Sequence, residues 1–458
     1  MHEWPATRRG DLGAVVTSRR VTGELTVGID IGTSSVKAVA ADADGNVVAR
    51  ARVPHDFYVP SPLQFEHDAA EAWHEGPRRA LEALGDVPAR AVSVAAMVPS
   101  LSAVDDDGMP RTPGLLYGDE RGHNDRATAI AEAGELMQFL NWQAKEYPDA
   151  RGYWMAQAVA NHALSGEAIV STTVAATAVP LFDWTKWDDA QLAKCGASAE
   201  QMPNIAISGT AVAEVRGRPG CVLEGGTIDA MAEQLVAGAD NEGDVLVICG
   251  TTLIVWAVSS EPVQVPHYYS IPHTAPGKFI VGGPSNAGGL FLNWVDRMLP
   301  AAPPATNPAR VPVWAPYPRG ERVPFQDATR RAQLVDLDLT HDASSIRRAA
   351  FEAAGFVTRR MIEAAPIGAR RIVATGGGTR LEEWTGALAD CTGLPVHVCA
   401  VPEGGALGAA FLARVAAGFE SNAIDAARWA RVSHIVDPDA AWTGAVAERY
   451  ARFCTIAG

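Results

Sequence analysis

The sequence has few cysteines, and none of them is placed for a metal site or a disulfide framework. Six thiols are scattered through 458 residues without a single Cys-x-x-Cys pair. Structural zinc sites and disulfide-rich domains space their cysteines closely, so this pattern is typical of reduced thiols in a cytoplasmic protein. The histidines are equally dispersed. His267 and His273 flank a loop rich in tyrosine and proline and are more typical of surface residues than of ligands.

Long apolar runs are also missing. The longest, such as residues 245–248, have the length of a strand, whereas a membrane helix needs about 18–20 apolar residues. Residues 1–23 contain several arginines and only a short apolar run, which argues against a secretory signal. We therefore expect residues 1–23 to form a flexible N-terminal extension and the protein to stay in the cytoplasm.

Positive charge is scarce, because 38 Lys and Arg stand against 53 Asp and Glu, for a net charge of −15. Nucleic acids and anionic membranes call for a basic surface, so we expect neither as a partner. A neutral substrate fits this charge more easily than an anionic one. The hydrophobic content of 48% is that of a globular protein, and the length is enough for two domains.

Strands and helices alternate along the chain. Three apolar segments, 25–31, 37–42 and 47–53, read as strands, and Asp-Gly between the last two favours a hairpin. Residues 68–84 have helical spacing and lead into a strand at 91–98. This alternation predicts an α/β fold with a largely buried sheet.

The second half opens in the same style, with a helix at 226–239 followed by a strand, a Gly-Thr-Thr turn and another strand. The turns at Gly32-Thr33 and Gly250-Thr251 lie about half the chain apart, which indicates an internal duplication. We expect a domain at 24–224 and a related one at 225–458, since paired domains often hold a ligand in their crevice.

Both turns combine glycine with hydroxyl residues after a strand, which suits them to phosphate binding. Backbone N–H groups and hydroxyls can reach phosphate oxygens there without side-chain obstruction. One such turn alone would be read as a polar hairpin, but two that open similar halves favour phosphate. The candidate ATP-binding residues are Gly32, Thr33, Ser34, Lys37, Gly250, Thr251 and Thr252.

Asp30 and a third glycine-rich stretch complete the candidates for nucleotide binding. Asp30 ends an apolar strand, where an unpaired carboxylate is costly. A Mg²⁺ ion would offset that cost, and hydrogen bonds to the turn amides are the alternative. Gly376, Gly377 and Gly378 follow a strand and would let an adenine or ribose approach the backbone, although such turns serve packing as often. Neither phosphate turn is a Walker A motif.

Seven segments stand in this order along the chain: GIDIGTSSVKAVAAD at 28–42, LLYGDERG at 115–122, GGTIDA at 225–230, CGTT at 249–252, PYPRGERVPFQD at 316–327, TGGGTRLEEWTGALADCTGLPV at 375–396 and EGGALGAAFLA at 403–413. Together they resemble the FGGY carbohydrate kinase family, whose superfamily includes actin and hexokinase, and within that family the likeness is to xylulokinases. The resemblance implies an α/β fold of two related ribonuclease H-like domains, of the actin and hexokinase type, with a central cleft.

The resemblance also implies roles for single residues. Asp229 matches the family's general base, although as a residue before a helix it would otherwise be read as a helix cap. Asp119 and Arg121 match a segment that lines the sugar pocket, with an ordinary salt bridge as the alternative. Met97 falls beside the sugar site, and Glu382 falls where a polar residue contacts adenine. The glycine-rich helix at 404–408 is implied to contact the adenosine loop.

Some positions that the resemblance implies to contact the sugar depart from the xylulokinase pattern. Val98-Pro99 follows Met97 where His-Gly is usual, Ala230 stands where Asn is common, and Tyr117-Gly118 replaces Trp-Asn. We therefore expect an ATP- and Mg²⁺-dependent kinase for a neutral ketose or polyol, by default D-xylulose. A related kinase for ribulose, glycerol, a tetritol or a sugar acid is the alternative, and a catalytically silent ATP- or sugar-binding sensor is a third. The sequence leaves the oligomeric state open, a homodimer included.

Overall fold

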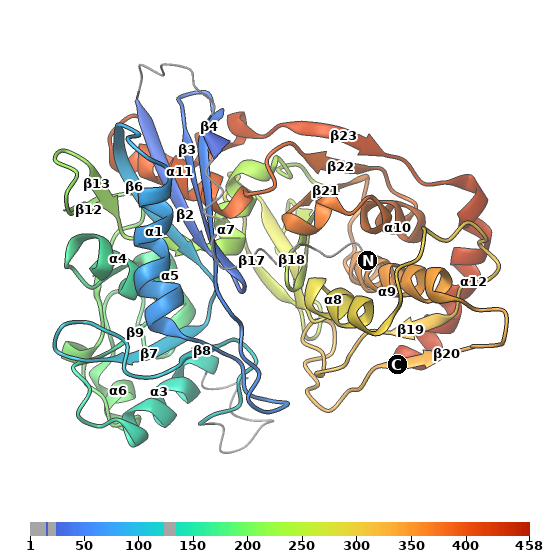
Figure 1. Cartoon of the computed structure of the whole chain (residues 1–458), viewed down its shortest axis with the longest axis horizontal. Coiled ribbons are helices and arrows are strands. Elements are labelled where there is room, and N and C mark those ends of the chain that lie inside the picture. The colour runs from blue at the N-terminus through green and yellow to red at the C-terminus, as the bar shows by residue number, and fades with distance from the viewer. Residues whose placement is uncertain (1–14, 17–23, 123–133) are drawn as a thin grey trace. The chain divides into compact units, whose positions relative to one another are not determined.

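A computed structural model of the chain describes residues 15–16, 24–122 and 134–458, which form two compact units (Figure 1). The first unit contains the described residues up to Leu235 together with Gly405–Ala426. The second contains Val236–Gly404 and Ala427–Gly458. The domain boundary at 224/225 stays a prediction. The expected extension at 1–23 lies outside the described residues except for strand β1 (Val15–Val16), which pairs with β4.

The first unit is built on an eight-stranded sheet in which β2, β6 and β13 run parallel. β2 and β3 form an antiparallel hairpin, and β4 and β1 continue the sheet from β3. The strands predicted in this part of the chain are confirmed. The bounds are β2 (Leu25–Ile31), β3 (Ser35–Ala41), β4 (Val47–Pro54), β6 (Ala89–Ala96), β12 (Ala211–Glu214), β13 (Val222–Glu224) and β14 (Thr227–Ile228).

All seven residues of β2 are buried, as expected for a central strand covered on both faces. Val27, Ile29 and Ile31 join a core shared with helix α1 (Gly76–Ala83). On the other face helix α11 (Gly404–Ala416) approaches so closely that a Cβ on Gly28 would lie 1.8 Å from the carbonyl oxygen of Ala406. Because side chains alternate along a strand, one face of β2 packs against α1 and the other against α11.

A smaller four-stranded sheet and several helices complete the first unit. The expected helix at 68–84 is a π-helical segment, η1 (Ala70–Glu75), that continues into α1. The other elements are β5 (Glu66–His67), β8 (Gly114–Leu116), β7 (Ser100–Val104), β9 (Gly152–Trp154), α3 (Glu135–Glu146), α4 (Ala156–Ser165), β10 (Ile169–Ser171), α5 (Thr172–Ala175), η2 (Ala176–Ala178), α6 (Asp189–Lys194), η3 (Ala199–Gln201) and β11 (Asn204–Ala206).

The second unit repeats the plan with a seven-stranded sheet. β15 pairs antiparallel with β16, β18 follows β16, and β21 and β22 run parallel to β15, which reproduces the order β4-β3-β2-β6-β13. Two related α/β units are therefore confirmed. The strands are β15 (Asp244–Cys249), β16 (Leu253–Ser259), β17 (Tyr269–Pro272), β18 (Phe279–Ser285), β21 (Arg371–Thr375), β22 (Val396–Cys399) and β23 (Val432–Val436), with the pair β19 (Val313–Ala315) and β20 (Gln333–Val335) outside the main sheet.

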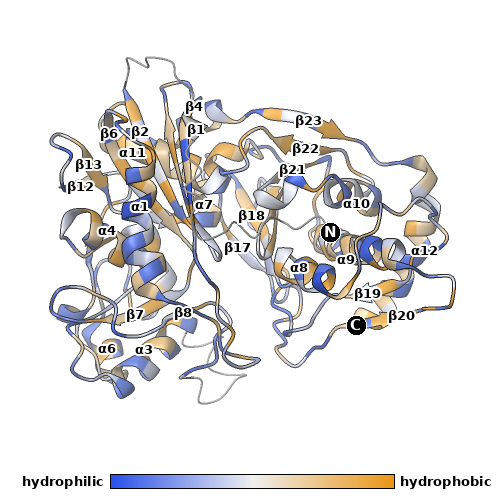
Figure 2. Ribbon diagram, in the orientation of Figure 1, coloured by the Kyte–Doolittle hydropathy of each residue, from blue (hydrophilic) through white to orange (hydrophobic). Residues whose placement is uncertain are grey.

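Helices of the second unit are tied together by buried charges. Glu352 on α9 accepts hydrogen bonds from Arg348 and Arg449, and Arg348 also binds Asp390 on α10. Figure 2 shows hydrophobic residues along the central strands of both units. The helical bounds are α7 (Asp229–Ala237), which links the units, α8 (Gly289–Met298), α9 (Ala343–Ala364), η4 (Gly377–Arg380), α10 (Glu382–Thr392), η5 (Ala423–Trp429) and α12 (Ala440–Ala457).

Two further observations concern the fold. His273 is buried, with Nε2 placed 3.0 Å from the carbonyl oxygen of Ala239, so its expected surface position was wrong. Across the described part of the chain, no helix combines the length and the apolar character needed to cross a membrane.

Candidate active site

The carboxyl ends of three parallel strands in the first unit carry the central candidates. Asp30 on β2 and Thr227 on β14 both pair with Ala95 on β6, one on each side. Asp229 follows β14 at the same level at which Met97 follows β6. Neighbouring strands lie about 4.8 Å apart, so Asp229 and the turn after β2 are roughly 10 Å apart across Met97.

Asp229 is the first residue of α7 and is half-buried. Its Oδ1 accepts a hydrogen bond of 2.7 Å from the N–H of Ala230. The amino terminus of a helix stabilises a negative charge, so this position suits a carboxylate. The same position also suits a helix cap, so a test must separate the two roles.

In the first predicted phosphate turn, Gly32–Ser35, three carbonyl oxygens accept hydrogen bonds. The N–H of His55 donates to Ser34 O at 3.2 Å, and the N–H of Gly32 donates to Ser35 O at 3.1 Å. His67 Nε2 donates to Thr33 O at 2.9 Å. With these carbonyl oxygens bound, an anion at this turn would meet its hydroxyls and its N–H groups other than that of Gly32.

His67 was not among the sequence candidates, yet it supports this turn. It is fully buried, and its Nδ1 accepts a 3.0 Å hydrogen bond from the indole N–H of Trp73. Burial lowers the pKa of His67 to about 3, and His55, whose ring lies 4.6 Å away, acts in the same direction. The ring is therefore neutral, with its proton on Nε2, and serves as a fixed donor.

Asp30 lies next to the turn on the α11 side of β2 and is only 4% exposed. Lys37 Nζ pairs with its Oδ2 at 3.2 Å. A Cβ on Gly405 would lie 3.1–3.3 Å from the carboxylate, so glycine there leaves Asp30 its space. Together with Gly408, whose Cβ would meet Ala232, this places Gly405 and Gly408 against elements of the first unit. The implied contact with the adenosine loop stays a prediction.

Asp30 could supply one protein ligand to a magnesium ion. Among the described residues, no three His, Cys, Asp or Glu side chains gather as an ion-binding cluster. Mg²⁺ in phosphate-transfer sites is commonly held by one or two carboxylates, with phosphate oxygens and water completing the octahedron. A single carboxylate at Asp30 is compatible with that arrangement.

The second phosphate turn, at Gly250–Thr252, is backed by the amino terminus of α8. The N–H groups of Gly289 and Leu290 donate to Gly250 O and Thr251 O, both at 2.9 Å. A Cβ on Gly288 would lie 2.3 Å from the backbone of Thr252. The chain needs Gly288-Gly289 for this close approach, and the pair was not among the sequence candidates.

The glycines of the third stretch lie beside the second turn in the same unit. β21 pairs in parallel with β15 at Ile248 and Thr375, so Gly376–Gly378 follow at the same sheet edge as Gly250. Cβ atoms on Gly376 and Gly378 would lie 2.9 and 2.7 Å from Cys249 O, whereas Gly377 faces open space. Glu382, in the first turn of α10, is exposed.

Asp119 and Arg121 form the ion pair that was the alternative to a sugar contact. Asp119 is fully buried, and its carboxylate accepts from Arg121 Nη2 and from the N–H of Phe65, both at 2.7 Å. Arg121 Nη1 binds Glu66 at 2.7 Å, and its guanidinium lies over Trp142. Two carboxylates therefore neutralise the arginine. The segment still borders the first turn, since Tyr117 Oη lies 3.3 Å from Thr33 Oγ1.

Glu321, in the GERVP segment, is a buried acid of the second unit. Its Oε1 accepts from the N–H groups of Asn286 and Arg322, and Ser285 donates to its Oε2. Burial raises the pKa of Glu321 from 4.5 to about 7. The segment thus anchors the chain between β18 and α8.

Glu321→Gln is expected to flatten the pH dependence of stability. Between about pH 4.5 and 7 the folded state holds a proton that the unfolded state has released, so the free energy of unfolding falls as pH rises. A shift of this size corresponds to about 3 kcal/mol. Urea unfolding at pH 5 and pH 8 measures the slope, and an equal slope in both proteins would contradict the assignment.

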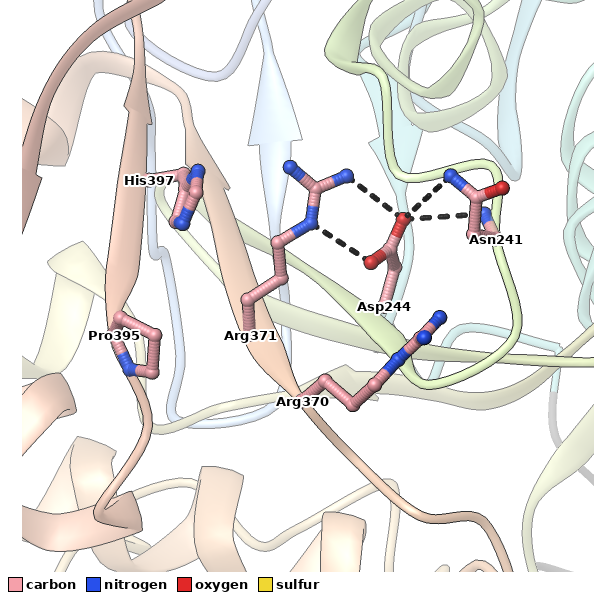
Figure 3. Close-up of a pocket in the computed structure, with 6 residues that line it drawn as sticks. All are labelled: Asn241, Asp244, Arg370, Arg371, Pro395 and His397. Carbon is pink, nitrogen blue, oxygen red and sulfur yellow. Dashed lines mark hydrogen bonds and ion pairs between the residues drawn. The ribbon is translucent and has the colours of Figure 1, made fainter.

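A surface cavity of about 460 Å³ lies elsewhere in the second unit (Figure 3). Its lining residues lie at or near the amino-terminal ends of β15, β21 and β22, the edge opposite to Gly250 and Gly376. Arg371 binds Asp244 through two hydrogen bonds of 2.8 and 2.9 Å, so the charges pair with each other. This cavity therefore lies at the opposite sheet edge from the turns predicted to bind phosphate and adenosine.

Two related α/β units, each with a glycine and hydroxyl turn after its first long strand, form the two-domain fold that the resemblance implied. Family models agree: the N-terminal domain of the FGGY family of carbohydrate kinases matches residues 25–124, and the C-terminal domain matches 245–417. The chain belongs to this family and is a carbohydrate kinase, an enzyme that phosphorylates a carbohydrate with ATP.

Among individual proteins, the chain is similar to xylulose kinases. It is 27% identical over 447 residues to the xylulose kinase of Escherichia coli, covering 87% of this chain and 91% of that protein. A gluconokinase of Bacillus subtilis is 23% identical over 455 residues, covering 86% and 87%. The solved xylulose kinase of Lactobacillus acidophilus superposes with a TM-score of 0.75 at 21% identity, covering 94% and 97%, which shows the shared fold.

Proposed function

We propose that the chain phosphorylates a neutral ketose or polyol with Mg·ATP, by default D-xylulose to D-xylulose 5-phosphate, and that Asp229 is the general base. The observation that supports this is the register of β2, β6 and β14. It brings the Asp229 carboxylate and the Gly32–Ser35 turn to one sheet edge. A proton acceptor and a phosphate site at that spacing leave room for a hydroxyl between them.

In the proposed reaction, a substrate hydroxyl oxygen bonds to the γ-phosphorus of ATP. The bond from that phosphorus to the β–γ bridging oxygen breaks, and ADP leaves with the electron pair. Asp229 takes the hydroxyl proton as the new bond forms. Thr33, Ser34 and the turn amides donate to phosphate oxygens, while Asp30 would hold a magnesium ion that neutralises phosphate charge.

The ion pair of Arg121 supports a neutral substrate. Its guanidinium is bound by Asp119 and Glu66, so it brings no net positive charge to a sugar carboxylate. Asp119 likewise accepts hydrogen bonds from Phe65 and Arg121, and these bonds hold the segment that follows β8. Hydroxyl recognition then falls to neutral groups near Met97.

The second candidate is a kinase for another substrate: a sugar acid, ribulose, glycerol or a tetritol. The similarity to a gluconokinase favours this reading for the acid. Val98-Pro99, Ala230 and Tyr117-Gly118 depart from the xylulokinase pattern at positions implied to face the sugar. Both candidates use the same phosphate chemistry and differ only in the acceptor.

A substrate panel tests the proposal. We expect Mg·ATP to yield ADP with D-xylulose or another neutral ketose or polyol, with a phosphate ester seen by mass spectrometry, and EDTA to stop the reaction. Ribulose, glycerol, erythritol and gluconate complete the panel, and turnover of one of the first three without D-xylulose would keep the neutral class but replace the default substrate. Turnover of gluconate alone would replace the proposed substrate class. ATP binding without transfer to any acceptor would favour a silent binding protein.

A further inference from the structure

Gln157 on α4 lies behind the strand ends that carry Met97 and Asp229. The residue is fully buried. Its Nε2 lies 3.0 Å from Ala96 O and 3.1 Å from Thr227 O. Ala96 ends β6 directly before Met97, and Thr227 stands two residues before Asp229. One amide group therefore joins the two strands that bring Met97 and Asp229 to the sheet edge.

The orientation of this amide is fixed by its partners. Two carbonyl oxygens attract the two hydrogens of the NH₂ group and would repel the amide oxygen. β14 has only two residues, and its ladder with β6 ends at Ile228 and Ala96. Gln157 supplies a side-chain link at the point where the main-chain ladder stops.

Other buried side chains hold the turn that leads into β14. Asn161, one helical turn after Gln157, donates to Gly225 O at 3.1 Å. Glu224 accepts from Gly226 N–H at 2.7 Å and from Ser93 Oγ at 2.8 Å. Gly226 has a φ of 91°, which favours glycine there. The path of the chain into Asp229 is thus set by packed polar groups.

We propose that Gln157 is a positioning residue for phosphoryl transfer. It holds the carbonyl of Thr227 beside that of Ala96 and so keeps the Asp229 carboxylate at the end of β6. Gln157 acts through the main chain and does not touch the substrate. The inference rests on the proposed role of Asp229 as the base, because only then does its placement control the rate.

Gln157→Met tests this, with Gln143→Met as the matched control. Gln143 is also fully buried in the first unit, and its Nε2 donates to Leu101 O at 2.9 Å. We expect Gln157→Met to lower kcat about 10- to 100-fold with KM for ATP nearly unchanged, since small displacements of a catalytic group cost that much. Both variants should lose similar Tm, and the control should keep kcat within about threefold. Equal kcat losses, or an unchanged kcat in Gln157→Met, would overturn the proposal.

Hydrogen exchange without substrate separates this inference from the proposed function. Amides of residues 226–230 should exchange faster in Gln157→Met and at the parent rate in Gln143→Met; equal rates in the two variants would overturn the positioning role. Hydrogen exchange tests whether Gln157 holds residues 226–230 even if the parent protein phosphorylates nothing in the panel. That second result would remove the proposed function and leave the positioning role to be judged by exchange. Should Gln157→Met fail to fold, Gln157→Asn, which keeps the amide but shortens its reach, takes its place with the same readouts.

Discussion

Asp229→Asn is expected to lower kcat for sugar phosphorylation by about 10²- to 10⁴-fold, the usual contribution of a general base. The amide has the shape of the carboxylate but cannot accept the proton of the attacking hydroxyl. Asn starts a helix as well as Asp does, so the hydrogen bond from Ala230 and the fold of α7 should survive. The substitution therefore separates chemistry from capping.

Asp188→Asn is the matched control for Asp229→Asn. Asp188 is half-buried in the same unit and caps α6 by accepting from the N–H groups of Ala190 and Gln191. We expect it to leave both kcat and Tm near the parent values. Steady-state ADP release with a saturating acceptor, together with thermal unfolding, gives both quantities. A parent-like kcat in Asp229→Asn would show that Asp229 is not the general base and serves only to begin helix α7.

The repeated strand-turn-strand units could be predicted because their signals are local. A largely apolar run before a Gly-Thr turn identifies β2, and the same pattern identifies β15. The resemblance added Asp229, which periodicity alone would have left as a helix cap. Asp119 and Arg121 show the limit of that transfer, since the sequence left both a sugar contact and an ordinary salt bridge open, and the structure shows the ion pair.

The supports of the site could not be predicted, because their partners are distant in sequence. His67 reaches a carbonyl 34 positions earlier, and Gln157 reaches one 70 positions later. No periodic pattern marks a buried histidine or glutamine as a donor to a turn. The return of Gly405–Ala426 to the first unit is of the same kind, because glycine-rich helices look alike in sequence wherever they pack.

Gly28→Ala is expected to destabilise the first unit by at least about 4 kcal/mol, a loss seen when packing at one site cannot relax. The added Cβ would lie 1.8 Å from Ala406 O and 2.4 Å from Ala410 N, and both belong to the backbone of α11. Thr26 Oγ1 also bonds to Ala410 O at 2.8 Å, so the helix cannot move without losing that bond. Chemical unfolding measures the change.

The control for Gly28→Ala is Gly386→Ala, a glycine inside α10 with no atom within 4 Å of its added Cβ. Alanine there should stabilise by about 0.5–1 kcal/mol, because it restricts the unfolded chain and favours the helix. Both variants add the same methyl group, so the opposite signs of their stability changes follow from the space available at each glycine. Any folded Gly28→Ala protein should also lose activity, because displacing α11 moves Gly405 relative to Asp30. Similar stabilities in the two variants would contradict the close contact between β2 and α11.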